Sequence, residues 1–139
     1  MRVLLAVDGS PYTKRMLAWL AVHDEMLNRQ TDYTVLTVVP EIPRHAGFFD
    51  LGDPAAYYEE QAEQVLAPVR AFIAQQGWQA RFEHRSGHAA EEIALAAMQT
   101  SPELIVLGSH GHSALGSLVL GSIATGVLAR CTTPVLLIR

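Results

Sequence analysis

Short apolar runs rich in β-branched residues alternate with stretches of helical spacing along the chain, and this alternation limits the fold more than any other feature. Strands are expected at residues 2–7, 33–39, 79–85, 103–107 and 133–138. The first two runs are almost wholly apolar, which is typical of strands buried on both faces of a parallel sheet. Residues 79–85 alternate only weakly, which predicts a strand at the edge of the sheet.

The stretches between these strands predict helices. The first should begin at Ser10, with Pro11 at the first helical position, and run to about Asn28. The later helices are expected at residues 55–76, at about 89–99 and from 121 onward. Pro68 should kink or divide the second helix, because proline lacks the backbone N–H that a helix interior needs. Residues 41–54, rich in turn-forming residues, predict a long loop before it.

About five alternations of strand and helix predict a three-layer α/β/α fold. The expected core is a five-stranded parallel sheet of Rossmann-like type, with right-handed crossovers and helices on both faces. The chain has 139 residues, of which 50% are hydrophobic, enough for one substantial core. We therefore expect one domain spanning residues 1–139.

The charge and the cysteine content limit which class of partner the protein binds and in which cellular compartment it is expected. Ten Lys and Arg against fourteen Asp and Glu give a net charge of −4, which argues against a nucleic acid or an anionic membrane as partner. Cys131 is the only cysteine, so no internal disulfide can form. The apolar run before Asp8 is too short for a signal segment or a membrane span. These features favour a cytoplasmic protein that binds small molecules or other proteins.

The turn after the first strand reads Asp8-Gly9-Ser10 and leads directly into a helix. In open parallel sheets, ligands bind at the carboxyl ends of the strands, near the point where the strand order reverses. Capping of the helix explains Ser10 fully, and a turn explains Gly9. Asp8 is harder to explain by local structure, which makes it the ligand-binding candidate of this turn.

The loop after the fourth strand is rich in glycine. Between residues 108 and 121 it has four glycines, which let backbone N–H groups approach an anion without clashes from Cβ atoms. Gly121 and Ser122 then open a helix, whose unpaired N–H groups and macrodipole favour a phosphate. A side chain at Gly121 should enter the space of that anion. A flexible loop followed by a closely packed helix is the alternative explanation.

Several better-known motifs are incomplete in this chain. Gly116 and Gly121 have the spacing of a phosphate-binding P-loop, but Ser122 and Ile123 stand where its Lys and Ser or Thr belong. Without that lysine, binding of phosphates is favoured over their transfer. The turn at Asp8 lacks the further glycines of a dinucleotide fingerprint, and the sequence around Ser109 lacks the first glycine of a nucleophile elbow.

The histidines form two close pairs in the sequence. His110 and His112 are two residues apart, and His84 and His88 are four apart. Neither pair has a carboxylate or cysteine at the spacing of a zinc site, so hydrogen bonding or exposure to water is the favoured role. His110 or His112 beside a phosphate is an intermediate hypothesis.

Three segments of the chain resemble motifs of a known family, the ATP-binding universal stress proteins. The chain has GSHG at residues 108–111, nine further residues, and then Gly121-Ser122, which is similar to the ATP motif of that family. Residues 6–10 (AVDGS) resemble its first strand and turn, and residues 133–137 (TPVLL) its last strand. The resemblance covers the whole chain and implies the fold of the adenine nucleotide alpha hydrolases.

The resemblance also implies a role for particular residues. Asp8 and the backbone of Val38 would contact the adenosine, with Leu107 and Gly108 lining the site. The phosphate-binding residues would be Gly111, Gly121 and Ser122. The ligand would be ATP, or else ADP or AMP, with Mg²⁺ among the phosphates.

Beyond the site, the resemblance implies a homodimer paired through residues 133–138. The leading hypothesis is a regulatory, stress-response module whose nucleotide occupancy changes a surface that a partner contacts. Two alternatives stay open. One is slow ATP hydrolysis, with Asp8, His110 or His112 positioning water. The other is a dimeric scaffold that holds no nucleotide.

Overall fold

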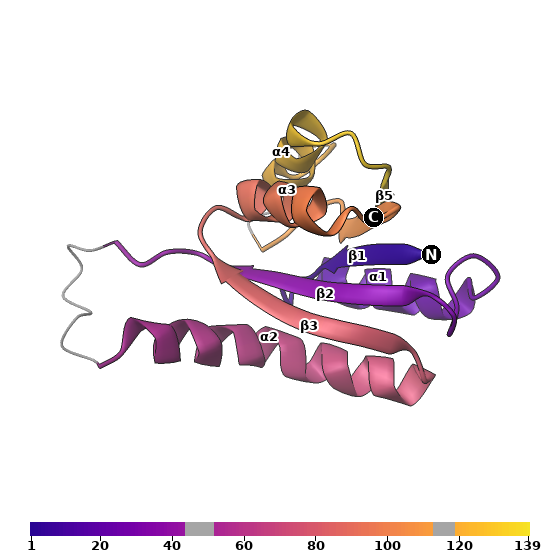
Figure 1. Ribbon diagram of the computed structural model, residues 1–139, viewed down its shortest axis with the longest axis horizontal. Coiled ribbons are helices and arrows are strands. Elements are labelled where there is room, and N and C mark those ends of the chain that lie inside the picture. Colours follow the sequence, from indigo (N-terminus) through magenta and orange to yellow (C-terminus); the bar gives the residue numbers. More distant parts are fainter. Residues whose placement is uncertain (44–51, 113–118) are drawn as a thin grey trace.

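The computed structural model describes residues 1–43, 52–112 and 119–139. Strands and helices alternate in this part of the chain (Figure 1). The elements are, in order, β1 (Arg2–Ala6), α1 (Pro11–Val22), β2 (Asp32–Val39), α2 (Pro54–Gln76), β3 (Gln79–Ser86), α3 (Ala89–Thr100), β4 (Leu104–Gly108), α4 (Ser122–Arg130) and β5 (Val135–Ile138). The five strands form one sheet in the order β3-β2-β1-β4-β5, and all pairs are parallel. The predicted α/β fold with a five-stranded parallel sheet is confirmed.

Strand β1 lies at the centre of the sheet and is paired on both sides. Leu4 is level with Thr34 of β2 on one side and with Ile105 of β4 on the other. From β1 the sheet grows first through β2 to β3, and then on the opposite side through β4 to β5. The strand order therefore reverses between β1 and β4, where a crevice forms at the carboxyl ends.

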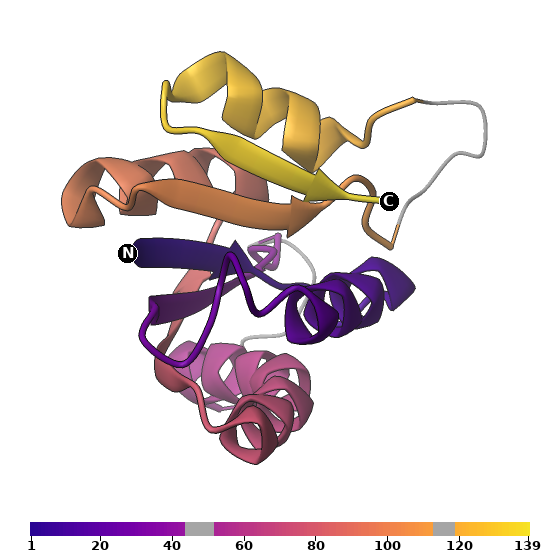
Figure 2. The same cartoon turned by 90° about the vertical axis from the view of Figure 1, so that its right-hand side faces the viewer.

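Helices cover both faces of the sheet (Figures 1 and 2). Helices α1 and α2 pack on one face, with Leu20 and Leu66 in a core that includes Leu5 of β1. Helices α3 and α4 pack on the other face, with Ile93 and Val127 in a core that includes Leu4. Alternate residues of β1 thus enter opposite cores, because successive side chains of a strand point to opposite faces.

Helix α1 ends at Val22, earlier than the predicted end near Asn28. His23 leaves the helical conformation at its C-cap, where its ring stacks on Trp19 and its Nδ1 lies 2.8 Å from the Trp19 carbonyl oxygen. Leu27, which has helical spacing in the sequence, is fully buried although it lies beyond the helix. The apolar residue at position 27 therefore indicated a buried side chain and not a longer helix.

Helix α2 is continuous through Pro68 and is not divided as predicted. Pro68 and Gln64, whose carbonyl loses its helical donor, both lie on the exposed side of the helix, where water can replace the missing bond. Gly77 ends the helix in the left-handed conformation, with φ 71°, as expected of a C-terminal glycine. Of the predicted loop 41–54, residues 44–51 lie outside the described residues.

Within the described ranges, no helix combines the length and the apolar character that crossing a membrane requires.

Helices α3 and α4 are in close contact at Gly126. A Cβ atom added there would lie 2.6 Å from the Cβ of Ala90, closer than side-chain carbons pack. The small residues at these two positions therefore set the distance between the helices that carry one side of the crevice.

We expect Gly126→Ala to lower the free energy of unfolding by about 1–3 kcal/mol, although alanine favours helices, because the new methyl group overpacks this contact. Chemical denaturation measures the effect. Ala90→Gly is the matched control, because it removes the methyl group that the added one would strike. In the Ala90→Gly background the same change should be neutral or stabilising, and equal losses in both backgrounds would contradict this packing explanation.

Candidate functional site

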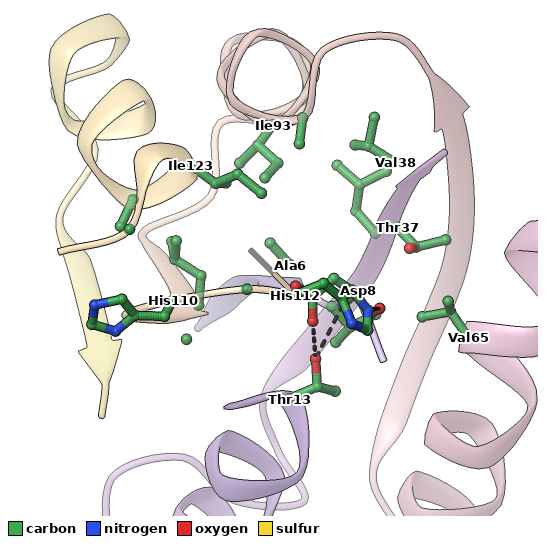
Figure 3. Close-up of a pocket in the computed structure, with 18 of the residues that line it drawn as sticks. Ala6, Asp8, Thr13, Thr37, Val38, Val65, Ile93, His110, His112 and Ile123 are labelled. Atoms are coloured by element: carbon green, nitrogen blue, oxygen red, sulfur yellow. Dashed lines mark hydrogen bonds between the residues drawn. The ribbon is translucent and has the colours of Figure 1, made fainter. Parts of the chain in front are cut away.

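A pocket of about 350 Å³ opens at the carboxyl ends of β1, β2 and β4, where the strand order reverses (Figure 3). Its walls come from the ends of these three strands, from the first turn of α4, and from side chains of α1, α2 and α3. The residues predicted from the sequence all line this pocket, namely Asp8, Val38, Leu107, Gly108, Gly111, Gly121 and Ser122. The tertiary structure therefore brings together residues more than 110 positions apart in the chain. Their role in ligand binding remains a prediction.

Asp8 is held in place by the first turn of α1. Its Oδ1 atom accepts hydrogen bonds from the Ser10 N–H and the Thr13 hydroxyl, both at 2.9 Å. The Asp8 N–H in turn donates to Thr13 Oγ1 at 3.1 Å. Because these donors use Oδ1, the second carboxylate oxygen, Oδ2, faces Gly111 on the other side of the pocket. Asp8 thus presents one fixed acceptor to a ligand.

Ser10 occupies the predicted N-cap position, but its side chain makes no capping hydrogen bond. Its hydroxyl is buried without a partner among the described residues. The capping explanation from the sequence therefore holds for the position of Ser10 and fails for its side chain. The oxygen that organises this turn belongs to Asp8.

The backbone of Val38 lies past the end of the pairing between β1 and β2. The last register pair is Ala6 with Leu36, and the Leu36 carbonyl accepts from the Val7 N–H at 2.9 Å. Backbone groups of a strand alternate in direction, so the N–H and C=O of Val38 point the same way as those of Leu36, beyond the last residue of β1. The crevice therefore exposes a donor and an acceptor beside apolar side chains such as Ile93.

Close packing of other protein atoms explains three of the predicted glycines. A Cβ atom at Gly108 would lie 2.6 Å from Tyr12 Cβ, and one at Gly111 would lie 2.7 Å from Asp8 Oδ2. At Gly121 it would lie 2.9 Å from the Ser109 carbonyl oxygen. A side chain at Gly121, which the sequence suggested would enter the space of an anion, would therefore also strike the protein backbone.

Helix α4 begins at the pocket without a side-chain cap. Gly121 is the N-cap residue and no side chain caps it within the described part of the chain. Its own N–H donates to the Ser109 carbonyl at 2.7 Å, so this amide, which the sequence suggested for anion binding, is already used. Ser122, Ile123 and Ala124 follow in the first turn and line the pocket. Their N–H groups are the ones that a helix leaves without internal partners.

The two histidines of the glycine-rich loop lie in different surroundings. His112 Nε2 is 2.6 Å from the backbone carbonyl oxygen of Asp8, and its ring lies beside that residue in Figure 3. The His110 ring lies apart from Asp8 in the same view. His110 Nδ1 is 2.9 Å from Ser109 Oγ, and its ring packs against Tyr12. His112 therefore links the loop after β4 to the turn after β1 by a side-chain hydrogen bond.

Sequence reasoning missed several lining residues on helices. Gln61 and Val65 reach the pocket from α2, and Ile93 reaches it from α3. No local motif marks these positions, because their role depends on how the helices pack. Thr13 could have been found, because it lies one turn into the helix that follows Asp8, within reach of the carboxylate.

We expect Asp8→Ala to lower the free energy of unfolding by about 1–3 kcal/mol, because the Ser10 N–H and the Thr13 hydroxyl lose their shared acceptor. Thermal or chemical unfolding measures the loss. Asp8→Asn is the matched control, since its amide oxygen can still accept both bonds, and it should stay close to the parent chain. An Asp8→Ala variant as stable as the parent would contradict the role assigned to Oδ1.

Comparison with known proteins identifies relatives of this chain by sequence. The model of the universal stress protein family matches residues 1–139. A universal stress protein of Thermus aquaticus is 34% identical over 139 residues, covering 99% of this chain and 97% of the relative. One from Mycolicibacterium smegmatis is 33% identical over 145 residues, covering 99% of this chain and 45% of the relative. The chain thus spans about half the length of some relatives and nearly all of others.

Solved structures share the fold at low sequence identity. UspA of Lactobacillus plantarum has a TM-score of 0.78 at 23% identity, covering 100% of this chain and 97% of the other. A universal stress protein of Archaeoglobus fulgidus in complex with dAMP has a TM-score of 0.71 at 20% identity, with 100% and 98% covered. A universal stress protein in complex with cAMP has a TM-score of 0.72 at 16% identity, with 100% and 97% covered.

Proposed function

Since this chain belongs to the universal stress protein family, we propose that its pocket binds an adenine nucleotide and that occupancy regulates contact with a protein partner. One observation carries the proposal. The residues expected to hold adenosine and phosphates come from distant parts of the chain and line a single pocket at the reversal of strand order. The dAMP and cAMP complexes of proteins with this fold support the same class of ligand.

Each part of the pocket suits one part of such a ligand. Apolar side chains and the backbone N–H and C=O of Val38, which lie past the end of the pairing with β1, suit the adenine ring and its polar edge. Asp8 Oδ2 suits the ribose hydroxyl groups, which donate to carboxylates. The first turn of α4, with the hydroxyl of Ser122, suits phosphate oxygens. The arrangement favours binding over phosphoryl transfer, because no lysine or arginine lies among the lining residues that the structure describes.

ATP with Mg²⁺ is the form that the family resemblance implies. Magnesium usually bridges one or two carboxylates and the phosphates, and keeps several water ligands. Asp8 supplies the one carboxylate among the described lining residues, and two hydrogen bonds already occupy its Oδ1 atom. Because Oδ2 is the oxygen that suits the ribose, the phosphates and water would supply most of the ligands of the ion.

Calorimetric titration with ATP, ADP, AMP and GTP tests the proposal. We expect the adenine nucleotides to bind at millimolar concentrations or below, and GTP more weakly, because the backbone of Val38 distinguishes the edges of the two bases. Asp8→Asn should weaken binding about three- to tenfold at unchanged stability, because a hydrogen bond to a charged acceptor is stronger than one to an amide. If no adenine nucleotide binds at millimolar levels, the proposal is wrong. Release of phosphate from ATP, measured in the same samples, tests slow hydrolysis.

The second part of the proposal is a homodimer that forms through the C-terminal strand. Strand β5 is at the edge of the sheet, and its residues Val135, Leu136 and Leu137 are only half-buried. The Pro134 and Ile138 carbonyls accept bonds from Ile105 of β4 and from Ser109 just after it. The Leu137 N–H therefore points away from the sheet, on the side where a second copy would pair in the proposed dimer.

We expect sedimentation of the parent chain to show a dimer, and Leu137→Pro to yield a monomer, because proline removes this outward donor. Circular dichroism serves as the control for folding of the variant. A parent chain that sediments as a monomer at micromolar concentration would overturn this part of the proposal.

A further inference from the structure

The wall of the pocket on the side of α2 holds two polar side chains that the proposed function does not use. Thr37, near the end of β2, is 2% exposed, and Gln61 of α2 is half-buried. Both line the pocket. Within the ranges that the structure describes, neither the Thr37 hydroxyl nor the Gln61 carboxamide has a hydrogen-bond partner. Polar groups in a buried wall need partners, so this pair points to a ligand that supplies them.

The position of Thr37 in β2 directs its side chain toward α2. Val35 and Val39, two residues before and after it, belong to the core that α1 and α2 cover. Val38 packs against the opposite core, because successive side chains of a strand alternate between the two faces. In Figure 3, Thr37 lies between Val38 and Val65. The Thr37 hydroxyl and the Val38 backbone therefore reach the pocket from neighbouring residues of one strand end.

Gln61 meets the same part of the pocket from α2. Three residues before it, the Tyr58 hydroxyl accepts a hydrogen bond from the Ile42 N–H at 3.2 Å, which ties α2 to the segment after β2. Four residues after it, Val65 packs on the turn after β1, since a Cβ atom added at Gly9 would lie 3.5 Å from Val65 Cγ2. Residues three and four positions apart share one face of a helix, so Gln61 lies between these two contacts. It thus lies over the ends of β1 and β2, where the base and the ribose are expected.

The chemistry of a carboxamide fits one particular edge of adenine. Its NH₂ group donates and its oxygen accepts, which is the pattern that pairs with N7 and the 6-amino group of adenine. Guanine has two acceptors at this edge, N7 and O6, so the carboxamide oxygen would face another oxygen. The N–H and C=O of Val38 suit a different edge, formed by N1 and the 6-amino group. The backbone and the side chain therefore do not compete for the same atoms of the base.

From this arrangement we infer that Gln61 is a specificity-determining residue, which binds N7 and the 6-amino group of adenine in a subsite that it shares with Thr37. The inference rests on the proposed adenine-nucleotide site and deepens it. It adds a contact from α2, a helix that holds none of the residues expected from the sequence to bind the nucleotide. Selection of adenine over guanine then depends on two edges of the base, and Gln61 controls one of them.

Calorimetric titration of the full chain with ATP and with 7-deaza-ATP, both in Mg²⁺, tests the inference without changing the protein. Carbon replaces N7 in the second compound, so the hydrogen bond from the carboxamide is lost. We expect 7-deaza-ATP to bind about three- to tenfold more weakly. Equal affinities would overturn the inference and leave the proposed function intact. Failure of the chain to bind any adenine nucleotide would refute the proposed function, and the inference with it.

Variants of α2 assign this preference to one side chain. Gln61→Leu removes the donor and the acceptor at similar volume, so it should weaken ATP binding about tenfold and make ATP and 7-deaza-ATP bind equally. Gln64→Leu is the matched control, because Gln64 is exposed on the same helix and does not line the pocket. It should leave both affinities unchanged, and unfolding curves check that both variants fold. A folded Gln61→Leu variant that still prefers ATP over 7-deaza-ATP would show that Gln61 does not bind N7.

Discussion

Hydrogen bonding of β1 on both of its edges is the constraint on which the rest of the structure depends. This central strand has helices on both of its faces, and Leu4 and Leu5 accordingly enter opposite cores. Because the crossovers of parallel strands are right-handed, building the sheet outward from β1 in both directions places helices on both faces. It also leaves the loops after β1 and β4 to diverge at the carboxyl ends. The pocket is the space between them.

Two kinds of contact keep that pocket open and shaped. Asp8 is fixed by the Ser10 N–H and the Thr13 hydroxyl, so one oxygen of its carboxylate is held against the first turn of α1. The loop after β4 lies close against it because Gly111 has no Cβ to meet Asp8 Oδ2. His112 then joins the two loops through the Asp8 carbonyl. The same residues therefore define the geometry of the turn and the chemistry offered to a ligand, which is why stability and binding must be measured separately at Asp8.

Glycine at these positions reflects packing within the protein as much as space for a ligand. The sequence suggested that the glycines expose amides to an anion, and the first turn of α4 keeps that property. Gly121, however, uses its own N–H for the Ser109 carbonyl, and a Cβ there would strike the backbone. A glycine that permits close approach of two backbone segments looks the same in a sequence as one that permits approach of a phosphate, because both need only the absence of a side chain.

The sequence by itself determined the order of strands and helices, the parallel sheet, and the residues at its carboxyl ends, because apolar spacing and turn residues are local properties. It misplaced the end of α1, where Leu27 is buried beyond the helix, and it allowed for a division of α2 at Pro68 that does not occur, since Pro68 lies on an exposed helix face. Only the tertiary structure decided that Gln61, Val65 and Ile93 line the pocket, and that His112 bonds to the Asp8 carbonyl. These contacts join segments that are distant in the chain. Their geometry depends on how helices pack on the sheet, which no local pattern of residues encodes.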